Sequence, residues 1–321
     1  MTLLITFLTS AIRVAVTFLF GSTGEIITEK SGHLNLGIPG IMCVGAACGC
    51  LGESLYTRNL AGYDDMKALP AVLIPILCAL LGAAFMGLIY SFLTVTLRAN
   101  QNVTGLALTT FGVGVTNYII SQIEFVTFQR GSRFFTASLP FASKLGWFGQ
   151  IFLSYGFMVY LGILIAVVAS LMLTKTRVGL HLRAVGENPA TADAMGINVT
   201  TYRYGATCVG SAIAGLGGLF FVMDYLGGNW EYCIDAMGWL SIALVIFTVW
   251  KPHMSIIGSF LFGGLYIAYN YISGVTFAQK ELLKMLPYVV TILVLIFTSI
   301  RNKRENQPPA GLGLNYYRED R

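Results

Sequence analysis

Long apolar runs alternate with short polar stretches along almost the whole chain. Most runs are close to the roughly 20 residues that an α-helix needs to cross the core of a bilayer. The pattern predicts about nine spanning helices, within a range of about eight to ten. The predicted spans are Leu3–Phe20, Leu34–Leu55, Leu69–Leu97, Val103–Ile123, Ile151–Leu173, Tyr204–Met223, Met237–Val249, Ile256–Ile272 and Leu286–Ile300. Met237–Val249 is short enough to be half of a broken helix.

Composition supports this reading. Hydrophobic residues make up 55% of the 321 residues and charged residues only 11%, and the mean hydropathy is +0.71. Soluble domains carry roughly a quarter charged residues, so we expect an all-α, polytopic transmembrane bundle embedded in the lipid bilayer. Residues 1–300 should form one membrane domain, followed by a cytoplasmic tail at 301–321. No basic stripe is interleaved with aromatic residues, so nucleic acid is not an expected partner.

Lysine and arginine set the predicted orientation, because cytoplasmic loops are enriched in them. They cluster between Lys175 and Arg203 and again in the tail. Four predicted spans separate the clusters, so both can be cytoplasmic and the N-terminus then lies outside. The inner set is Lys175, Arg177, Arg183, Arg203, Arg98, Lys251, Arg301, Lys303, Arg304, Arg318 and Arg321. The outer set is Glu53, Asp64, Asp65, Glu231 and Asp235, together with Arg130, Arg133 and Lys144, which run against the rule.

The sequence lacks the common motifs of metal-binding, catalytic and nucleotide-binding sites. The six cysteines form no CxxC pair, and there are only three histidines, so we expect no metal site and no cofactor. The sequence contains no GxxxxGK[ST], HExxH or GxSxG motif. The chain is therefore not expected to hydrolyse ATP by the P-loop route, and no catalytic set is predicted.

Polar residues interrupt the apolar pattern at Gly21–Gly40, "GSTGEIITEKSGHLNLGIPG". Glu25 and Glu29 are one helical turn apart and can share a face. The glycines and Pro39 favour an interrupted helix, which membranes tolerate where backbone is buried or lines a cavity. An ordinary cytoplasmic loop followed by a glycine-rich packing helix is an equal alternative.

A second polar stretch is Arg98–Asn117, "RANQNVTGLALTTFGVGVTN". Its amides and hydroxyls suit an uncharged polar solute, and they equally suit hydrogen bonds between helices. The candidate substrate-path residues are Asn35, Gln101, Asn102, Thr109 and Asn117. A third stretch, Gly210–Phe221, repeats small residues every fourth position and predicts close helix packing rather than a phosphate loop.

The stretch "RAVGENPATADAMGI", Arg183–Ile197, is hydrophilic and well punctuated. Asn188 before Pro189 is the favoured N-cap and first-turn pair, and Gly196 supplies a stop. We predict a helix of about two turns over Pro189–Met195, too short to be stable unless something holds it. Its small, apolar composition suits insertion into a groove on another protein, whereas a plain loop helix is the alternative.

Several of these segments resemble the permeases of ABC importers of the branched-chain amino acid, simple-sugar and nucleoside group. The resemblance rests on "GLHLRAVGENPATADAMGINV", "GEIITEKSGHLNLGIPGIMCVGA", "ALVIFTVWKPHMSIIGSFLFG", "LPYVVTILVLIF" and the tail "QPPAGLGLNYYRED". It covers nearly the whole chain, and the coupling stretch and the tail are its specific parts. Pro39 stands where the family usually has an acid.

The resemblance implies an importer of two permeases and two ATPases, fed by an extracytoplasmic substrate-binding lipoprotein. In that reading residues 176–202 are the coupling segment, and its short helix docks on the ATPase subunit. The expected contact residues are Gly186, Glu187, Asn188, Pro189, Ala192 and Gly196. The second permease is either a copy of this chain or a paralogue, and the location is the inner membrane of a bacterium.

The sequence leaves three functions to compare. A permease for a nucleoside, with a ribose-like simple sugar as the nearest variant, fits the capped helix predicted over Pro189–Met195 and the absence of a P-loop motif. An ion-coupled secondary transporter would need carboxylates deep in its spans, and here Asp224 comes closest. An integral-membrane enzyme would need a catalytic set, which is not evident.

Overall fold

The computed structural model describes residues 2–58, 60, 65–138, 146–272, 274, 276–301 and 307–317. Asp64, Lys144, Lys303, Arg304, Arg318 and Arg321, which entered the orientation prediction, lie outside these residues. The described residues form helices joined by turns, without a strand, and this confirms the all-α class.

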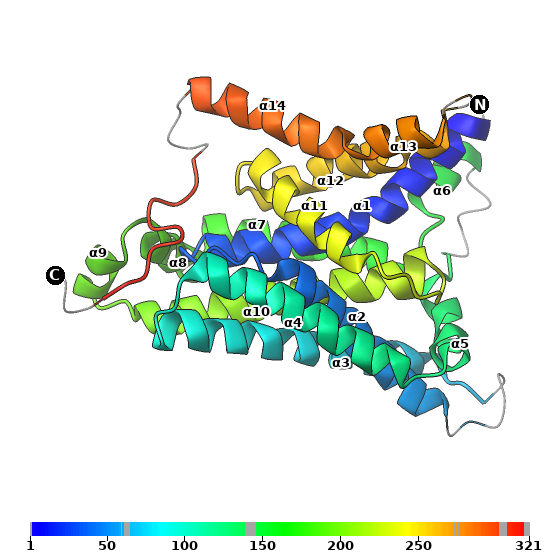
Figure 1. Ribbon diagram of the computed structural model, residues 1–321, viewed down its shortest axis with the longest axis horizontal. Coiled ribbons are helices and arrows are strands. Elements are labelled where there is room, and N and C mark those ends of the chain that lie inside the picture. Colours follow the sequence, from blue (N-terminus) through cyan, green and yellow to red (C-terminus); the bar gives the residue numbers. More distant parts are fainter. Residues whose placement is uncertain are drawn as a thin grey trace.

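The first half of the chain supplies four long helices (Figure 1). They are α1 (Thr2–Glu29), α2 (Ile38–Thr57), α3 (Ala68–Ser91) continued by the π-helical segment η1 (Phe92–Thr96), and α4 (Gln101–Ser121). Two shorter helices follow, α5 (Phe125–Phe135) and α6 (Gly146–Phe152), before the apolar α7 (Phe157–Lys175).

The second half begins with two short helices, α8 (Arg177–Glu187) and α9 (Pro189–Ala194). The central helix α10 (Val199–Phe220) follows and continues as the π-helical η3 (Phe221–Tyr225). The remaining elements are α11 (Ile234–Phe247), α12 (Pro252–Ile267), the 3₁₀ turn η4 (Ala268–Asn270), α13 (Phe277–Lys284) and α14 (Leu286–Arg301).

Within the part of the chain that the structure describes, six helices are long and apolar enough to cross a membrane: α1, α2, α3 with η1, α4, α7, and α10 with η3. The chain is therefore a multi-pass membrane protein. The predicted short run became α11, with 14 residues, and the last two predicted spans became α12 and α14, with 16 residues each. The crossings of these three shorter helices stay a prediction.

Small residues on α10 allow it to pack closely against α1, α2 and α3. A Cβ added to Gly210 would lie 2.4 Å from the carbonyl oxygen of Gly24, and one added to Gly218 would lie 2.0 Å from that of Met42. At Gly215 an added Cβ would lie 2.3 Å from Ala83. The packing interpretation of Gly210–Phe221 is confirmed, because backbone contacts this close admit only glycine.

Two predicted boundaries are wrong. The first helix does not stop at Phe20 but continues to Glu29, so the loop alternative fails for the first half of Gly21–Gly40. The interruption comes at residues 30–37, and Pro39 lies in the first turn of α2, where its missing N–H costs nothing. The run predicted from Ile151 is broken between α6 and α7, so the long helix begins only at Phe157.

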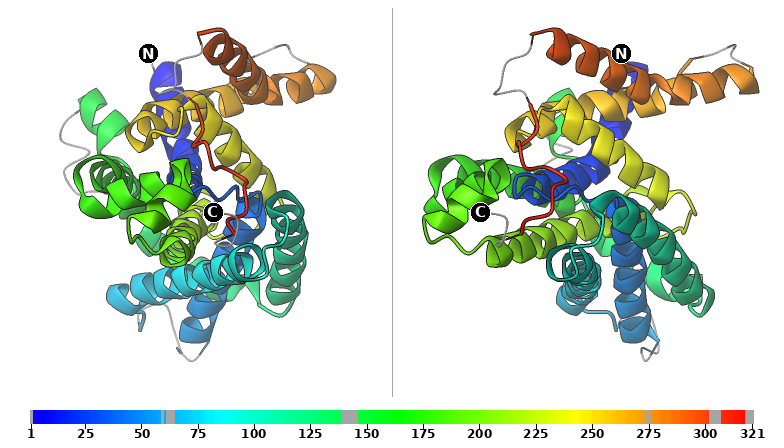
Figure 2. Two further views of the ribbon diagram at one scale, coloured as in Figure 1. Left: turned by 90° about the vertical axis from the view of Figure 1, so that its left-hand side faces the viewer. Right: turned by 60° about the vertical axis from the view of Figure 1, so that its left-hand side comes forward.

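The bundle has two chemically different ends. We call the end that carries α8, α9 and residues 307–317 the tail end, and the opposite one, which carries α5, α6 and the start of α1, the α5 end. Figure 1 shows the tail end on the left and the α5 end on the right. Residues 307–317, red in Figure 2, cross the tail end from the side of α14 toward α3 and α4.

Candidate functional site

The helix α9 forms because its sequence supplies a cap at each end. The Asn188 side chain accepts a hydrogen bond from the Thr191 N–H at 3.0 Å, and Pro189 occupies the first turn. Gly196 has φ +81°, a left-handed conformation that glycine adopts without strain. The helix ends at Ala194, so the predicted capped helix is confirmed to within one residue. The sequence analysis missed α8, Arg177–Glu187, which is capped by Thr176 at its start and by Asn188 at its end.

Part of the predicted docking set faces inward. Ala192 is 3% exposed and packs in a small apolar cluster with Val185 and Val199. Gly186 is also buried, and a Cβ added there would lie 2.3 Å from the carbonyl oxygen of Lys30, so the backbone of α8 packs closely against the turn after α1. These residues hold α8 and α9 against the bundle.

The other predicted contact residues face outward, since Glu187, Asn188 and Gly196 are exposed and Pro189 is half-buried. Met195, at the end of α9, was not in the predicted set and is 77% exposed. This exposure is a property of the fold and is not visible in the sequence, and an exposed apolar side chain of this kind is typical of an interaction site.

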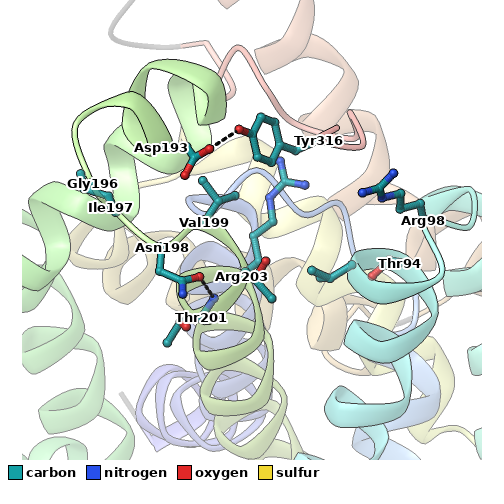
Figure 3. A pocket seen from close by; sticks show the side chains of 12 residues that line it. Thr94, Arg98, Asp193, Gly196, Ile197, Asn198, Val199, Thr201, Arg203 and Tyr316 are labelled. Carbon is teal, nitrogen blue, oxygen red and sulfur yellow. Dashed lines mark hydrogen bonds between the residues drawn. The ribbon is translucent and has the colours of Figure 1, made fainter. Parts of the chain in front are cut away.

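The tail segment, residues 307–317, ties α8 and α9 to the turn after α1. The Gly311 N–H donates to the Gly186 carbonyl at 2.9 Å, and the Gly313 N–H donates to the Gly32 carbonyl at 3.1 Å. The Tyr316 hydroxyl lies 2.7 Å from Oδ2 of Asp193 on α9, as Figure 3 shows. Three segments that are far apart in sequence are thereby fixed to one another.

The same segment reaches the turn between η1 and α4, α4 itself and α10. Asn315 donates through Nδ2 to the carbonyl of Arg98 at 2.7 Å. Arg203 of α10 is 2% exposed and donates through Nη2 to the Leu314 carbonyl at 3.2 Å. Gln101 donates through Nε2 to Asn315 Oδ1 at 3.3 Å. Because these partners come from the turn before α4, from α4 and from α10, the tail segment acts as a strap across this end of the bundle.

A polar cavity of about 650 Å³ opens beside the strap (Figure 3). It lies between the α9–α10 turn, η1 and Tyr316. Arg98 and Arg203 contribute its positive charges, and Asp193 contributes a carboxylate. Arg98 has φ +57° and places its guanidinium 4.7 Å from the centre of the Tyr317 ring.

Three of the predicted substrate-path residues make hydrogen bonds with the turn at residues 30–37. Asn35 lies in the turn, and Gln101 and Thr109 reach it from α4. Oε1 of Gln101 accepts from the Leu34 N–H at 2.8 Å, and the Thr109 hydroxyl donates to the Leu36 carbonyl at 2.8 Å. Asn35 accepts through Oδ1 from the Gly37 N–H at 2.9 Å. Each therefore makes a hydrogen bond within the protein, as the packing alternative expects.

Buried polar groups line the inner side of this turn. Glu25 accepts from the Asn35 N–H at 3.1 Å, and Glu29 accepts from the indole N–H of Trp250. His33 is fully buried, with Nδ1 3.2 Å from the Thr207 hydroxyl. Burial, followed by the nearby Arg203 cation, holds the pKa of His33 well below its usual value.

The other two predicted path residues lie apart. Asn102 is exposed on α4. Asn117 lies about one turn before the end of α4 at the α5 end, where it lines a cavity of about 90 Å³. That cavity is enclosed by Cys43 of α2, Val113 and Thr116 of α4, and residues from Trp230 to Asp235 before and within α11. The structure thus splits the predicted set between the two ends of the bundle.

Comparisons with known proteins agree with these features. A family described as "Branched-chain amino acid transport system / permease component" matches residues 7–295. The nucleoside ABC transporter permease protein NupC of Lactococcus lactis is 32% identical over 86% of this chain and 87% of its own. The putative glucose ABC transporter permease protein TsgC13 of Haloferax volcanii is 28% identical over 97% of each chain, and the guanosine ABC transporter permease protein NupQ of Bacillus subtilis is 28% identical over 88% of each. Because the family match spans most of the sequence, the chain belongs to the family of branched-chain amino acid transport system permease components.

Proposed function

We propose that this chain is the membrane-spanning permease of an ATP-driven importer of nucleosides. The observation that carries the proposal is its similarity, over nearly its whole length, to relatives named as nucleoside and guanosine permeases. A simple-sugar importer is the second candidate, supported by the similarity to a putative glucose permease across 97% of both chains. An ion-coupled transporter has less support, since the buried carboxylate of Asp224 is already paired with Arg13 at 3.2 Å.

The tail end is proposed as the cytoplasmic, ATPase-binding end. The exposed residues at the C-terminal end of α9, which are Thr191 and Ala194 to Gly196, insert into a groove of the ATPase subunit, with Met195 as the apolar contact. ATP hydrolysis belongs to that separate subunit, because this sequence has no P-loop. The buried contacts of Gly186 and Ala192 then serve to transmit the motion rather than to bind.

The proposed motion passes from α9 into the bundle along two routes. The chain itself continues from α9 into α10, the central helix. The strap joins α9 to the turn after α1 and to the start of α4 through hydrogen bonds of Gly313, Asn315 and Tyr316. Closure of two ATPases can thus tilt several spans together, which is the rigid-body rocking expected of alternating access.

The remaining partners follow from the same proposal. A second permease, either a copy of this chain or a paralogue, completes the pathway. A substrate-binding protein delivers the solute at the α5 end, which faces away from the cytoplasm of a bacterial inner membrane. This orientation places Arg98, Arg203 and Lys251 inside, as the distribution of basic residues favours.

Transport tests the solute. The permease, its ATPase and its binding protein, placed in vesicles, should accumulate radiolabelled nucleosides when ATP is supplied on the ATPase side. Labelled ribose and glucose in the same assay decide between the two candidates. ATP-independent uptake, or uptake driven by an ion gradient, would remove the ABC proposal.

Docking is tested separately by Met195→Asp, which places a charge on the exposed end of α9. We expect co-purification of the ATPase to fall by about tenfold, because a buried charge in an apolar contact costs more than it gains. Leu282→Asp on α13 is the matched control, since Leu282 is 66% exposed and lies near the N-terminal end of the bundle. Equal co-purification of both variants would place the ATPase contact elsewhere.

A further inference from the structure

The cavity at the α5 end contains polar groups that the fold leaves without partners. The Thr116 hydroxyl is buried, the residue being 2% exposed, and it has no hydrogen-bond partner. The indole N–H of Trp230 is also buried and unpaired. Buried polar groups are nearly always satisfied by protein, water or ligand, so two such groups lining one cavity indicate a site for a polar molecule.

The walls of this cavity combine aromatic rings with amide and hydroxyl groups. Trp230 and Tyr232 lie edge to face with ring centres 6.3 Å apart, and Tyr232 is 70% exposed. Asn117 and Thr116 come from adjacent positions on α4. Flat rings bind the faces of planar heterocycles, while amides and hydroxyls bind their edges.

Two carboxylates complete the lining. Glu231 is exposed at the mouth, and Asp235 lies in the first turn of α11, where the helix dipole favours a negative charge. Neither lysine nor arginine occurs among the described residues of the lining. Burial, followed by the Glu231 carboxylate, raises the pKa of the nearby Cys233 thiol to about 12. The potential at the mouth is therefore negative, which favours hydroxyl donors and opposes anions.

We propose that this cavity holds the planar base of an uncharged nucleoside entering the permease, with ribose hydroxyls donating to Glu231 and Asp235, and that its carboxylates exclude phosphorylated solutes. The inference rests on the proposed nucleoside transport and adds the residues that discriminate among solutes. At about 90 Å³ the cavity is smaller than a typical ligand cleft of about 300 Å³ or more. It therefore encloses one ring of the solute and leaves the ribose at the mouth.

Saturation-transfer NMR on the permease–ATPase complex in nanodiscs tests this without the binding protein, whose own selectivity would otherwise dominate. The probes are uridine and uridine 5′-monophosphate. The wild-type complex should transfer saturation to the base protons of uridine about tenfold more strongly than to those of the monophosphate, because the two carboxylates repel the phosphate. Equal transfer to both probes would overturn the proposal.

Variants separate the two parts of the site. Glu231→Gln with Asp235→Asn should raise the monophosphate signal to that of uridine, whereas Glu281→Gln on α13 removes an exposed carboxylate elsewhere and should change nothing. Tyr232→Ala should lower the uridine signal about threefold or more, against Trp147→Ala on α6 as the control for an exposed aromatic residue.

The same preparations show which proposal has failed. Wild-type vesicles that take up no nucleoside would remove the proposed function itself. Vesicles that transport nucleosides while the cavity variants leave both NMR signals and uptake unchanged would remove only this site. Loss of ATPase co-purification in a cavity variant reports misfolding, and the milder Tyr232→Phe, which retains the ring, then replaces Tyr232→Ala and should retain the uridine signal.

Discussion

The tail end and the α5 end differ in what some of their polar side chains contact. At the tail end, side chains of Gln101, Asn315 and Tyr316 bond to segments more than a hundred residues away or to the turn after α1. At the α5 end, Thr116 and Trp230 face a cavity without partners. Hydrogen bonds thus cross-link segments of the tail end, although His33 Nε2 and Arg203 Nε are buried there without a partner as well. In the proposed importer the tail end receives the motion of the ATPases, and the cavity at the α5 end receives the solute.

The largest expected loss of stability should come from removing the strap, residues 307–317, from the tail end. Deleting residues 307–321 takes away the partners of Arg203, Gln101 and Asp193 at once. Leaving a buried polar group unpaired costs about 1–3 kcal/mol, more for a charged one, so we expect a loss of about 3 kcal/mol or more. The thermal midpoint in detergent should fall by several degrees.

Leu314→Ala is the control for the deletion, since the Leu314 side chain is 61% exposed and only its carbonyl is used by Arg203. Its midpoint should remain within about a degree or two of wild type. A deletion that unfolds at the same temperature as the full chain would show that the strap does not stabilise the tail end.

At the other half of the bundle an ion pair between two candidate spans, α1 and α10 with η3, provides a contrasting case. Arg13 of α1 donates to the backbone carbonyl of Asp224 at 2.7 Å and to its Oδ1 at 3.2 Å. The Asp224 side chain is 1% exposed and that of Arg13 is 37% exposed. Arg13→Met leaves the buried carboxylate without its cation, and because Arg13 is partly solvated we expect a loss of about 2 kcal/mol.

Adding Asp224→Asn to Arg13→Met should recover part of that loss, since a neutral amide is cheaper to bury than a lone charge. Thermal unfolding of the two single variants and the double variant measures the coupling. Additive losses would mean that the two side chains do not depend on each other, and the pair would then be no more than a surface contact.

The sequence predicted what depends on near neighbours. The cap of α9 follows from Asn188, Pro189 and Gly196, which lie within nine residues, and the structure forms it as predicted. Long apolar runs likewise located the spans, because twenty consecutive residues carry the signal. Breaks inside such runs were harder, since residues 153–156, which separate α6 from α7, are not polar enough to interrupt an apolar average.

Contacts between distant segments left no local trace. Tyr316 and Asp193 are 123 positions apart, and the sequence around each residue does not predict their hydrogen bond. The tail sequence contributed only to the resemblance to ABC importer permeases. Its role as a strap depends on which helices fold beside it. For the same reason the path residues Asn35 and Asn117 looked alike in the sequence, although they lie at opposite ends of the bundle.

A smaller effect tests one contact of the strap. Tyr316→Phe removes the hydroxyl that lies 2.7 Å from Asp193 and keeps the ring in its apolar cluster. We expect a loss of about 1 kcal/mol, the usual net value of such a bond. Tyr317→Phe on the neighbouring residue, whose ring lies under Arg98, should change the stability by less than about 0.5 kcal/mol. Equal effects of both variants would deny the Asp193 contact any special role.

The last prediction concerns acid, because its effect is absent at neutral pH and grows as the pH falls. The three histidines are His33 and His181, which contact α10, and His253, which contacts Ser170 of α7. His33 lies in the turn that the strap binds at the tail end. The pKa of buried His33 is held well below its usual value, so the folded protein keeps the ring neutral. The unfolded chain binds a proton below about pH 6.5. Stability from this residue is therefore complete above that pH and declines as the pH falls below it, by at most about 1.4 kcal/mol per pH unit.

His33→Gln should flatten the dependence of the thermal midpoint between about pH 7.5 and 5.5, whereas His253→Gln, at an exposed position on α12, should preserve it. If His33→Gln and wild type lose stability in parallel, the acid sensitivity arises from other groups and the tail end is not where it begins.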